Sequence, residues 1–292
     1  MKTSFIKVLL ASALMIVAAG LKASAQTDNV EFRGNECRAE VARLIKAAGD
    51  RGGSAAERAG AAADLLAGKA YADMSVADPA YGPLEICLDS MNALGLVEYS
   101  IAASRASFEP LASEQDFVRE LLKTRYRRGE NNGFTSRLRY ASDWIADNAY
   151  RNSLREVTFD LPGNVSTSRT LDGITRHREL YPALADSATF ERMQMLEMGY
   201  RVHKIPYMKR ESIGKKNVLE LLRDNDIIVI LDRSSDSDLL DAGFLRIVDG
   251  KPYLLHASQR DGRVVVDAEP LGDMMKLRAK EIAGYRVLRI KD

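Results

Sequence analysis

Two cysteines and three histidines are the side chains of this sequence best suited to covalent and acid–base chemistry. A cysteine thiolate attacks amide carbonyls, and an imidazole can accept and return the proton in such a reaction. Cys87 is a candidate nucleophile, but it lies in a short segment, residues 84–88, that predicts a strand, and a buried thiol is chemically inert. Together with Cys37 it could instead form one disulfide in an oxidising compartment. We therefore favour a structural role for Cys87 over a nucleophilic one.

Acid–base chemistry could instead involve Asp241 and His256. If their segments form neighbouring strands, we expect an ion pair or a hydrogen bond between the two side chains. A metal site formed by these two residues and another carboxylate, such as Glu98, is an alternative, although the spacing is not specific for any metal. We interpret His177 and His203 as surface residues. No metal ion or other cofactor is therefore expected.

The carboxyl-terminal half has the pattern needed to build such strands. Asp249-Gly250 and Asp261-Gly262 each separate two apolar segments, and Asp-Gly is a preferred sequence for a two-residue hairpin turn. We predict further strands at residues 154–161, 200–207, 227–231 and 285–290, a loop at 162–170, and short helices at 218–223 and 273–282. His256 is therefore expected in the middle strand of two successive hairpins.

The amino-terminal half has helical periodicity. Helices are predicted at residues 36–48, 55–67, 93–106 and 136–152. Another helix begins after Ser113, which forms a capping box with Asp116. Asn35 is the expected cap of the first helix, and Gly68 is a stop signal for the second. Helices followed by an antiparallel set of strands predict an α+β fold with a C-terminal antiparallel sheet.

Residues 1–25 have the pattern of a secretory signal peptide. Lys2 and Lys7 precede an apolar segment at residues 8–21, and Ala23-Ser24-Ala25 is a small-residue cleavage sequence. The apolar segment is shorter than the about 20 residues that a membrane-spanning helix requires, so no membrane span is expected once this peptide is removed. We therefore expect a periplasmic or secreted protein.

The remaining chain has almost no net charge. Removal of residues 1–25 takes away three lysines and no acidic residue, so the formal net charge changes from +1 to −2. This balance argues against nucleic acid as the main partner, because such binding depends on an excess of basic residues. We divide the chain into an N-terminal helical extension, residues 26–68, and a main domain, residues 69–292, that is long enough to bury a large core.

Three short segments resemble the catalytic segments of one family of cell-wall hydrolases. Residues 91–99 resemble its nucleophile helix, residues 239–244 its general-base strand, and residues 254–258 the strand whose histidine orients the base. The family is the N-acetylmuramoyl-L-alanine amidase-like branch of the NlpC-type, papain-like hydrolases. Further similarity extends from about Lys69 to the C-terminus. The resemblance implies a papain-like core with the nucleophile on a helix and its partners on adjacent strands.

Two of the three catalytic positions implied by this resemblance are changed. The family has Asp-Cys where this chain has Asn92-Ala93, and its base histidine corresponds to Asp241, whereas His256 is retained at the orienting position. A helix N-terminus lowers the pKa of a cysteine thiol and so activates it, but Ala93 has no nucleophilic atom. The loss of two groups favours natural decay of the site over a single engineered substitution.

The resemblance also implies which residues contact the substrate, namely the peptidoglycan stem peptide or its muramyl sugar. Guanidinium groups suit carboxylates, and an aromatic face suits a sugar or a peptide. The alternative is a helix whose tryptophan is core and whose arginines are solvated. The candidate substrate-binding residues are Arg137, Arg139, Tyr140, Asp143, Trp144 and Ser258.

We therefore expect a secreted amidase-like pseudoenzyme that binds a peptidoglycan peptide, a muropeptide or a protein partner. The first alternative is an active cell-wall amidase or peptidase with a rearranged site, in which Asp241 and His256 activate water. A solvated aspartate is a poor base for this purpose, because its reference pKa of about 3.9 is far below neutral pH. The second alternative is a regulator that binds a soluble partner and no cell-wall ligand.

Overall fold

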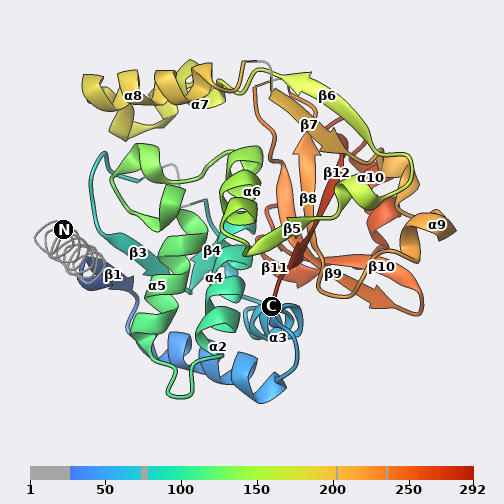
Figure 1. Ribbon diagram of the computed structural model, residues 1–292, viewed down its shortest axis with the longest axis horizontal. Helices are drawn as coiled ribbons and strands as arrows, with labels where there is room; N and C mark the ends of the chain where they lie inside the picture. Colours follow the sequence, from blue (N-terminus) through green and yellow to red (C-terminus); the bar gives the residue numbers. More distant parts are fainter. Residues whose placement is uncertain (1–26, 74–77, 202, 235) are drawn as a thin grey trace, which may run out of the picture.

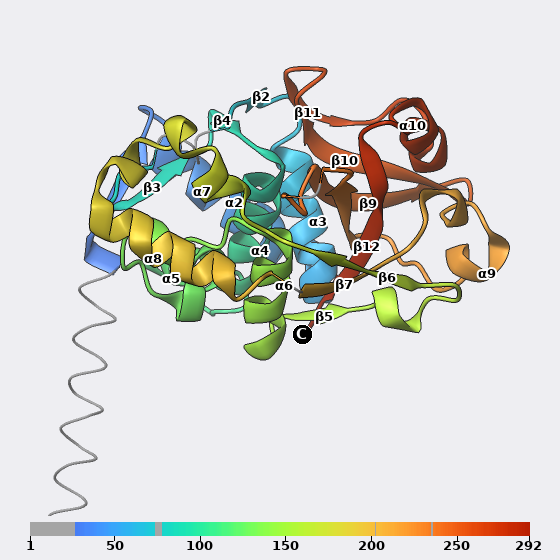
Figure 2. The same ribbon diagram turned by 90° about the horizontal axis from the view of Figure 1, so that it is seen from above.

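The computed structural model describes residues 27–73, 78–201, 203–234 and 236–292, so the predicted signal peptide lies outside the described residues. Figure 1 shows helices on one side of the molecule and a curved sheet on the other. In Figure 2 two short helices, α9 (Lys216–Leu219) and α10 (Leu271–Leu277), lie beyond the sheet, on the side away from the other helices. The chain therefore has the mixed α+β architecture that its sequence predicts.

Eight strands of the described residues form the main sheet. Their spatial order is β4 (Ser90–Met91), β2 (Ala70–Tyr71), β11 (Arg263–Val266), β10 (Lys251–Ser258), β9 (Asp241–Val248), β8 (Ile227–Asp232), β12 (Ile282–Ile290) and β5 (Leu154–Glu156). Every neighbouring pair from β11 to β5 in this order is antiparallel, so the predicted C-terminal antiparallel sheet is confirmed. The two strands at the other edge, β2 and β4, are parallel to each other.

Both faces of this sheet are covered. In β8, Ile227 and Val229 belong to the core shared with the large helical layer, whereas Ile228 and Ile230 belong to the core shared with α9 and α10. Successive side chains of a strand point to opposite faces, so a strand that is apolar at every position is buried on both sides. The large helical layer comprises α2 (Cys37–Arg51), α3 (Ala55–Leu65), α4 (Ala93–Ala106), α5 (Glu114–Arg125) and α6 (Ala141–Tyr150).

Helix α4 lies at the centre of the helical layer and has the predicted bounds. Twelve of its 14 residues are buried, because α2, α3 and α5 pack around it and β9 and β10 pack against it. A helix that is surrounded on every side is apolar or small in nearly every position. Helices α2 and α3, from the predicted N-terminal extension, belong to the same hydrophobic core as α4.

An arm of the chain, residues 165–207, projects beside the helical layer at the top of Figure 1. It begins and ends in a two-stranded antiparallel ribbon, β6 (Val165–Arg169) with β7 (His203–Tyr207). Between these strands lie α7 (Gly173–Arg176) and α8 (Ser187–Met198). Leu171, Ile174 and Leu184 of the arm form a third hydrophobic core with Phe134 and Tyr140 of the main body. A further small sheet pairs β1 (Val30–Arg33) with β3 (Leu84–Cys87) in parallel.

The predicted helix at residues 136–152 is wrong in its first turn and a half, since α6 begins only at Ala141. The Ser136 hydroxyl donates to the Gly133 carbonyl, Arg137 forms a bridge with Tyr126, and the Leu138 N–H donates to the carbonyl of Arg125. These contacts with the end of α5 hold residues 137–140 in an extended conformation. The segment that carries Arg137 and Tyr140 is therefore a loop wall and not a helix face.

Other errors also come from long-range contacts. The strand predicted at residues 154–161 ends at Glu156, because the Thr158 hydroxyl accepts the Val287 N–H and the chain turns there. The loop predicted at 162–170 contains β6, whose partner β7 is distant in the sequence. The first helix has Glu36 at its N-cap without a side-chain bond, and not the predicted Asn35 cap. The capping box of Ser113 and Asp116 is confirmed.

The two cysteines are free thiols in the structure, so the disulfide that the sequence allows is not formed. The Cys37 thiol donates to the Ile86 carbonyl, and burial raises the pKa of this thiol to about 11. It is therefore protonated and chemically quiet at neutral pH. Within the described residues no helix combines the length and the apolar character needed to cross a membrane.

A buried ion pair between Glu98 of α4 and Arg125 of α5 gives a stability prediction. Arg125 Nε donates to Glu98 Oε2 at 2.7 Å, and both side chains are almost fully buried. Arg125→Met leaves the carboxylate without its partner and should lower the free energy of unfolding by about 3–5 kcal/mol in urea titrations. Lys46→Met, which breaks an exposed pair with Asp50, should change it by less than about 1 kcal/mol. Equal effects of the two substitutions would contradict this role.

Candidate functional site

A cleft with two connected pockets lies at the N-terminus of α4. The Ala93 pocket has a volume of about 440 Å³, and its lining includes Ala93, Asp241 and Ser258. The Arg137 pocket has a volume of about 330 Å³, and its lining includes Arg137 and Tyr140. The two pockets share the lining residues Asp73, Asn92, Leu94 and Leu239. Their volumes fall within or near the range of small-molecule sites.

Asn92 lines both pockets, whereas Ala93 lines only the Ala93 pocket. Asn92 caps α4, since its side-chain oxygen accepts the Gly95 N–H at 2.8 Å, and its side-chain amide donates to Asp73 at 3.0 Å. Ala93 is the first residue of α4 and is half-buried against the Ala93 pocket. The N-terminus of α4 therefore opens into the cleft at a residue that carries only a methyl group.

Asp241 and His256 are in contact, as their expected positions on neighbouring strands predict. Asp241 is the first residue of β9, and its Oδ2 lies 2.7 Å from His256 Nδ1 on β10. Its other oxygen accepts the Ala242 N–H at 2.8 Å, and Arg278 Nη1 lies 3.7 Å from Oδ2. Both Asp241 oxygens are thus engaged by groups of the protein itself.

A second carboxylate holds the opposite edge of the His256 ring. Asp267, which follows β11, has its Oδ2 3.4 Å from His256 Nε2, and all three side chains are buried. Burial opposes a charged imidazole, but the hydrogen bond to Asp241 and the negative charges of Asp241 and Asp267 outweigh it and raise the pKa of His256 to about 10. His256 is therefore an imidazolium at neutral pH and has no lone pair with which to accept a proton.

Two features bring Asp241 and His256 to the cleft: a glycine that lets β9 approach β10 closely, and a buried aspartate that caps α6. Gly243 lies opposite His256, and a Cβ atom on it would be 2.3 Å from the Leu255 carbonyl oxygen. Only glycine permits this close approach of β9 to β10. Asp238, fully buried in the loop before β9, accepts the N–H groups of Ala141 and Ser142 at 2.8 and 2.6 Å. This cap ties the start of α6 to the loop that leads to Asp241.

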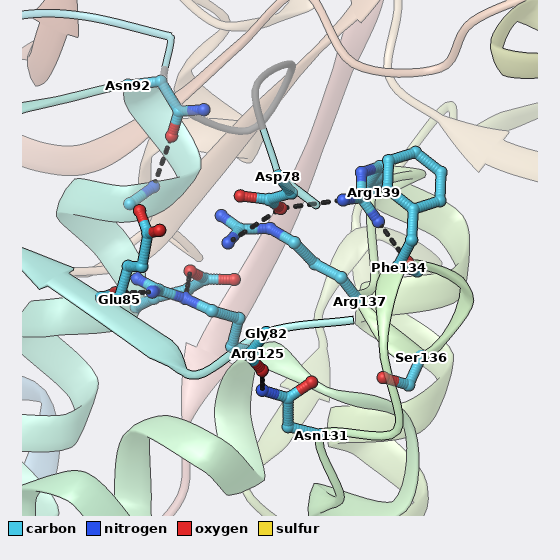
Figure 3. Close-up of polar contacts among 12 residues, drawn as sticks. Asp78, Gly82, Glu85, Asn92, Arg125, Asn131, Phe134, Ser136, Arg137 and Arg139 are labelled. Carbon is cyan, nitrogen blue, oxygen red and sulfur yellow. Dashed lines mark hydrogen bonds and ion pairs between the residues drawn. The ribbon is translucent and has the colours of Figure 1, made fainter. Parts of the chain in front are cut away.

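Arg137 and Arg139, which line the Arg137 pocket, share the carboxylate of Asp78. Figure 3 shows Arg137 and Arg139 pointing toward Asp78. Arg139 Nη2 lies 2.7 Å from Asp78 Oδ2, whereas Arg137 Nη1 is 3.5 Å from the same atom. Arg139 also stacks on Phe134, at 3.6 Å from the ring centre. Because two guanidinium groups share one carboxylate, this trio carries a net positive charge beside the pocket.

Tyr140 lines the Arg137 pocket, but its hydroxyl forms hydrogen bonds with residues of the arm. It donates to Glu197 of α8 at 2.6 Å and accepts the Ile174 N–H of α7 at 3.1 Å. Burial, together with the Glu197 carboxylate, raises the pKa of Tyr140. The arm also contributes His177 to this pocket, where the ring nitrogen Nε2 lies 3.3 Å from Asp236 Oδ2. The imidazole is half-exposed, in keeping with its predicted surface position.

The remaining predicted substrate-binding residues lie in different surroundings. Trp144 is fully buried in the core beneath the helical layer and has no surface to offer a ligand. Asp143 is buried and forms a two-point ion pair with Arg127. Neither residue lines the cleft. Ser258 does line the Ala93 pocket, and its hydroxyl donates to Asp261 at 2.6 Å.

The chemistry available to this cleft is limited by these contacts. Ala93 offers no nucleophile, and in the described part of the chain no group of three or more His, Cys, Asp or Glu side chains is arranged to hold a metal ion. Glu98, the third member of the alternative metal site, is instead paired with Arg125. Asp267, Asp78 and Arg278 were not anticipated from the sequence, although each contacts an anticipated residue. The cleft is suited to binding by ion pairs and hydrogen bonds.

Comparison with known proteins identifies similar sequences and folds. A family model described as N-acetylmuramoyl-L-alanine amidase-like matches residues 63–282. An N-acetylmuramoyl-L-alanine amidase from Bacteroides uniformis is 30% identical, with a TM-score of 0.72, over 79% of this chain and 97% of that structure. No curated protein matches the chain.

Two other solved structures are similar in fold. One, from Bacteroides fragilis, carries the name of a xylanase and is 29% identical, with a TM-score of 0.71, over 78% of this chain and 98% of its own. The other, from Legionella pneumophila, is 17% identical, with a TM-score of 0.67, over 88% of this chain and 95% of its own. At that identity the similarity concerns the fold alone.

The raised pKa of His256 predicts a dependence of stability on pH. The unfolded imidazole titrates near 6.5, but the folded one titrates near 10. The stabilisation is therefore complete below pH 6.5 and is lost as the pH rises toward 10. Between pH 7 and 9 the free energy of unfolding should fall by up to about 1.4 kcal/mol per pH unit.

Urea titrations at pH 7, 8 and 9 measure this slope, with His256→Gln as the reference because it retains every other titrating group. The expected result is a steeper loss of stability for the unaltered protein than for His256→Gln. Parallel pH profiles would contradict an imidazolium at this position.

Proposed function

This chain belongs to the N-acetylmuramoyl-L-alanine amidase-like family, and from that membership we propose that it is a catalytically degenerate member that binds peptidoglycan peptide without cleaving it. The observation that carries the proposal is Ala93, the first residue of α4, which lies in the cleft where the family resemblance places a nucleophilic cysteine. Covalent catalysis fails without its nucleophile, because the members of such a unit act together.

The contacts of Asp241 argue against the alternative of an active amidase with a rearranged site. A general base must accept a proton from a water molecule, and existing hydrogen bonds and nearby positive charges oppose this transfer. The two Asp241 oxygens accept from His256 and from the Ala242 N–H, and Arg278 lies close by. His256 already carries its proton, so it cannot receive another. The pair therefore acts as a structural ion pair on the cleft floor.

Arg137 is the residue best placed to recognise a cell-wall peptide. Its side chain lines the Arg137 pocket. Its only ion pair with a described residue is the 3.5 Å contact with Asp78, a carboxylate that also pairs with Arg139. A guanidinium group with spare donors binds carboxylates by paired hydrogen bonds. Peptidoglycan stem peptides contain such carboxylates, in glutamate residues for example. The ligand is therefore oriented with its acidic part toward Arg137.

The packing of α4 against the sheet and the predicted signal peptide also support the proposed function. Helix α4, with the sheet strands β9 and β10 beside it, supports assignment to the NlpC-type, papain-like class, in which a helix carries the nucleophile and adjacent strands carry its partners. The signal sequence predicted at residues 1–25 supports a periplasmic or secreted location, where peptidoglycan is accessible. A soluble protein partner is the alternative ligand for the same cleft.

Calorimetric titration with N-acetylmuramoyl-L-alanyl-D-glutamate tests the proposed binding. The unaltered protein should bind this ligand, and Arg137→Gln should weaken binding by roughly tenfold to a hundredfold, the loss expected for hydrogen bonds to a charged group. Arg155→Gln provides a matched control, because Arg155 is exposed and pairs with Asp160 away from the cleft. Absence of binding, or equal binding by Arg137→Gln in its folded state, would refute the proposal.

A further inference from the structure

We propose that one end of the molecule, formed by η7 (Arg210–Ser212), α9 and α10, docks on an anionic phospholipid bilayer. This end lies beyond the sheet, on the side away from the large helical layer (Figure 2), and α10 packs against η7. Docking there goes beyond the proposed function, because it determines where the protein acts and not which compound its cleft binds. We refer to ten charged residues of this surface as the basic end: Lys209, Arg210, Glu211, Lys215, Lys216, Glu220, Arg233, Asp273, Lys276 and Lys280.

The basic end is much more positive than the rest of the chain. Its seven basic and three acidic side chains give a formal net charge of +4, whereas residues 26–292 as a whole carry −2. The other residues of that range therefore carry −6. Arg278 and Glu281, which lie beside the basic end and line the Ala93 pocket, pair with each other and add no net charge. Such an asymmetry indicates a surface that meets a negatively charged partner.

The acidic residues near the basic end do not neutralise it. Each of its three acids lies beside one cation, in the pairs Arg210–Glu211 at 2.9 Å, Lys276–Asp273 at 2.8 Å and Lys216–Glu220 at 4.0 Å. Asp232 is next to Arg233 in the sequence, but its carboxylate accepts the Ser234 N–H and lines the Arg137 pocket. Four cations therefore have no carboxylate within ion-pair distance among the described residues, namely Lys209, Lys215, Arg233 and Lys280.

Two arginines of the basic end are held side by side. Arg210 Nη1 and Arg233 Nη2 both donate to the carbonyl oxygens of Ala279 and Ile282, at distances between 2.8 and 3.1 Å. Two guanidinium groups that share acceptors lie close together, and their mutual repulsion favours an anion beside them. Arg233 is exposed, so its remaining N–H groups can donate to a phosphate oxygen of a lipid headgroup.

Leu277 gives this surface an apolar side chain suited to a bilayer. It is 73% exposed, and together with Asp273 and Lys276 it forms the exposed face of α10. Insertion of such a side chain between lipid headgroups removes its apolar surface from water, whereas a soluble anionic polymer has no apolar layer for it to enter. The combination of unpaired cations with an exposed leucine therefore favours an anionic bilayer over a soluble polyanion.

Sedimentation with lipid vesicles measures this docking. The protein, secreted through its own signal sequence, is mixed at low salt with vesicles of phosphatidylglycerol and phosphatidylcholine in equal amounts, or of phosphatidylcholine alone. We expect binding to the anionic vesicles only. Sodium chloride at about 0.5 M should abolish this binding, because salt screens charges at a surface.

Two triple variants with the same change in net charge test the basic end. The basic-end variant should bind the anionic vesicles about a hundredfold more weakly, since each basic residue near such a surface contributes about fivefold. The control variant, altered at exposed positions of α2, should lose less than about threefold. Urea titrations verify that both are folded. The basic-end variant is Lys209→Gln, Arg233→Gln and Lys280→Gln, and the control is Arg38→Gln, Lys46→Gln and Arg51→Gln.

A pair of single variants tests the apolar contact. Leu277→Ser should weaken binding to the anionic vesicles by about fivefold to tenfold, because the serine side chain gains nothing from entering the headgroup layer. Leu111→Ser replaces a leucine that is 90% exposed between α4 and α5, and it should change binding by less than about twofold.

Each outcome of these measurements decides for or against docking on a bilayer. Selective loss of binding in the basic-end variant and in Leu277→Ser supports it. Equal binding by the two triple variants, or absence of binding to the anionic vesicles, would overturn it. An unchanged affinity of Leu277→Ser would also overturn it, since charge alone fits a soluble polyanion. Ligand binding in the cleft is tested separately, because the substituted residues line neither of its pockets.

Discussion

Burial of α4 on nearly every side is the constraint on which the cleft depends. Helices α2, α3 and α5 and strands β9 and β10 contact it, and the capped N-terminus is the part that opens into the cleft. The position of residue 93 is therefore determined by the packing of its neighbours along the helix and not by its own side chain. This explains how the cleft keeps its shape with only a methyl group at that point.

Asp241 and His256 on the floor of the cleft are physically coupled. The Asp241 carboxylate provides one of the two negative charges that keep His256 protonated. Asp241 and Asp267 then hold the imidazolium in a buried, charge-compensated group. A histidine held in this way keeps its proton near neutral pH.

The sequence predicts the parts of this structure that depend on local signals. The bounds of α4 follow from a run of apolar residues with helical periodicity, and the β9–β10–β11 meander follows from its two Asp-Gly turns. Asp267 could have been found by extending this reasoning. In the second hairpin Val265 lies opposite His256, so a residue two positions later lies on the same face.

Other features could not be predicted because they depend on contacts between distant segments. Residues 137–140 have helical periodicity, yet their contacts with Arg125 and Tyr126 make them extended. Nothing in the local sequence shows that Asp78 would pair with Arg137 and Arg139, or that Asp238 would cap α6. The sequence therefore predicts several residues that line the cleft, among them Ala93, Asp241 and Ser258, whereas the electrostatics of the cleft could be known only from the fold.

The central claim is that the cleft binds a cell-wall compound and leaves it whole. Native mass spectrometry of the protein incubated for days with an equimolar amount of N-acetylmuramoyl-L-alanyl-D-glutamate tests this most directly, because it weighs the bound ligand. The account predicts a complex whose ligand keeps its full mass throughout. Accumulation of L-alanyl-D-glutamate and N-acetylmuramic acid, abolished by Asp241→Asn, would contradict it and establish a working hydrolase.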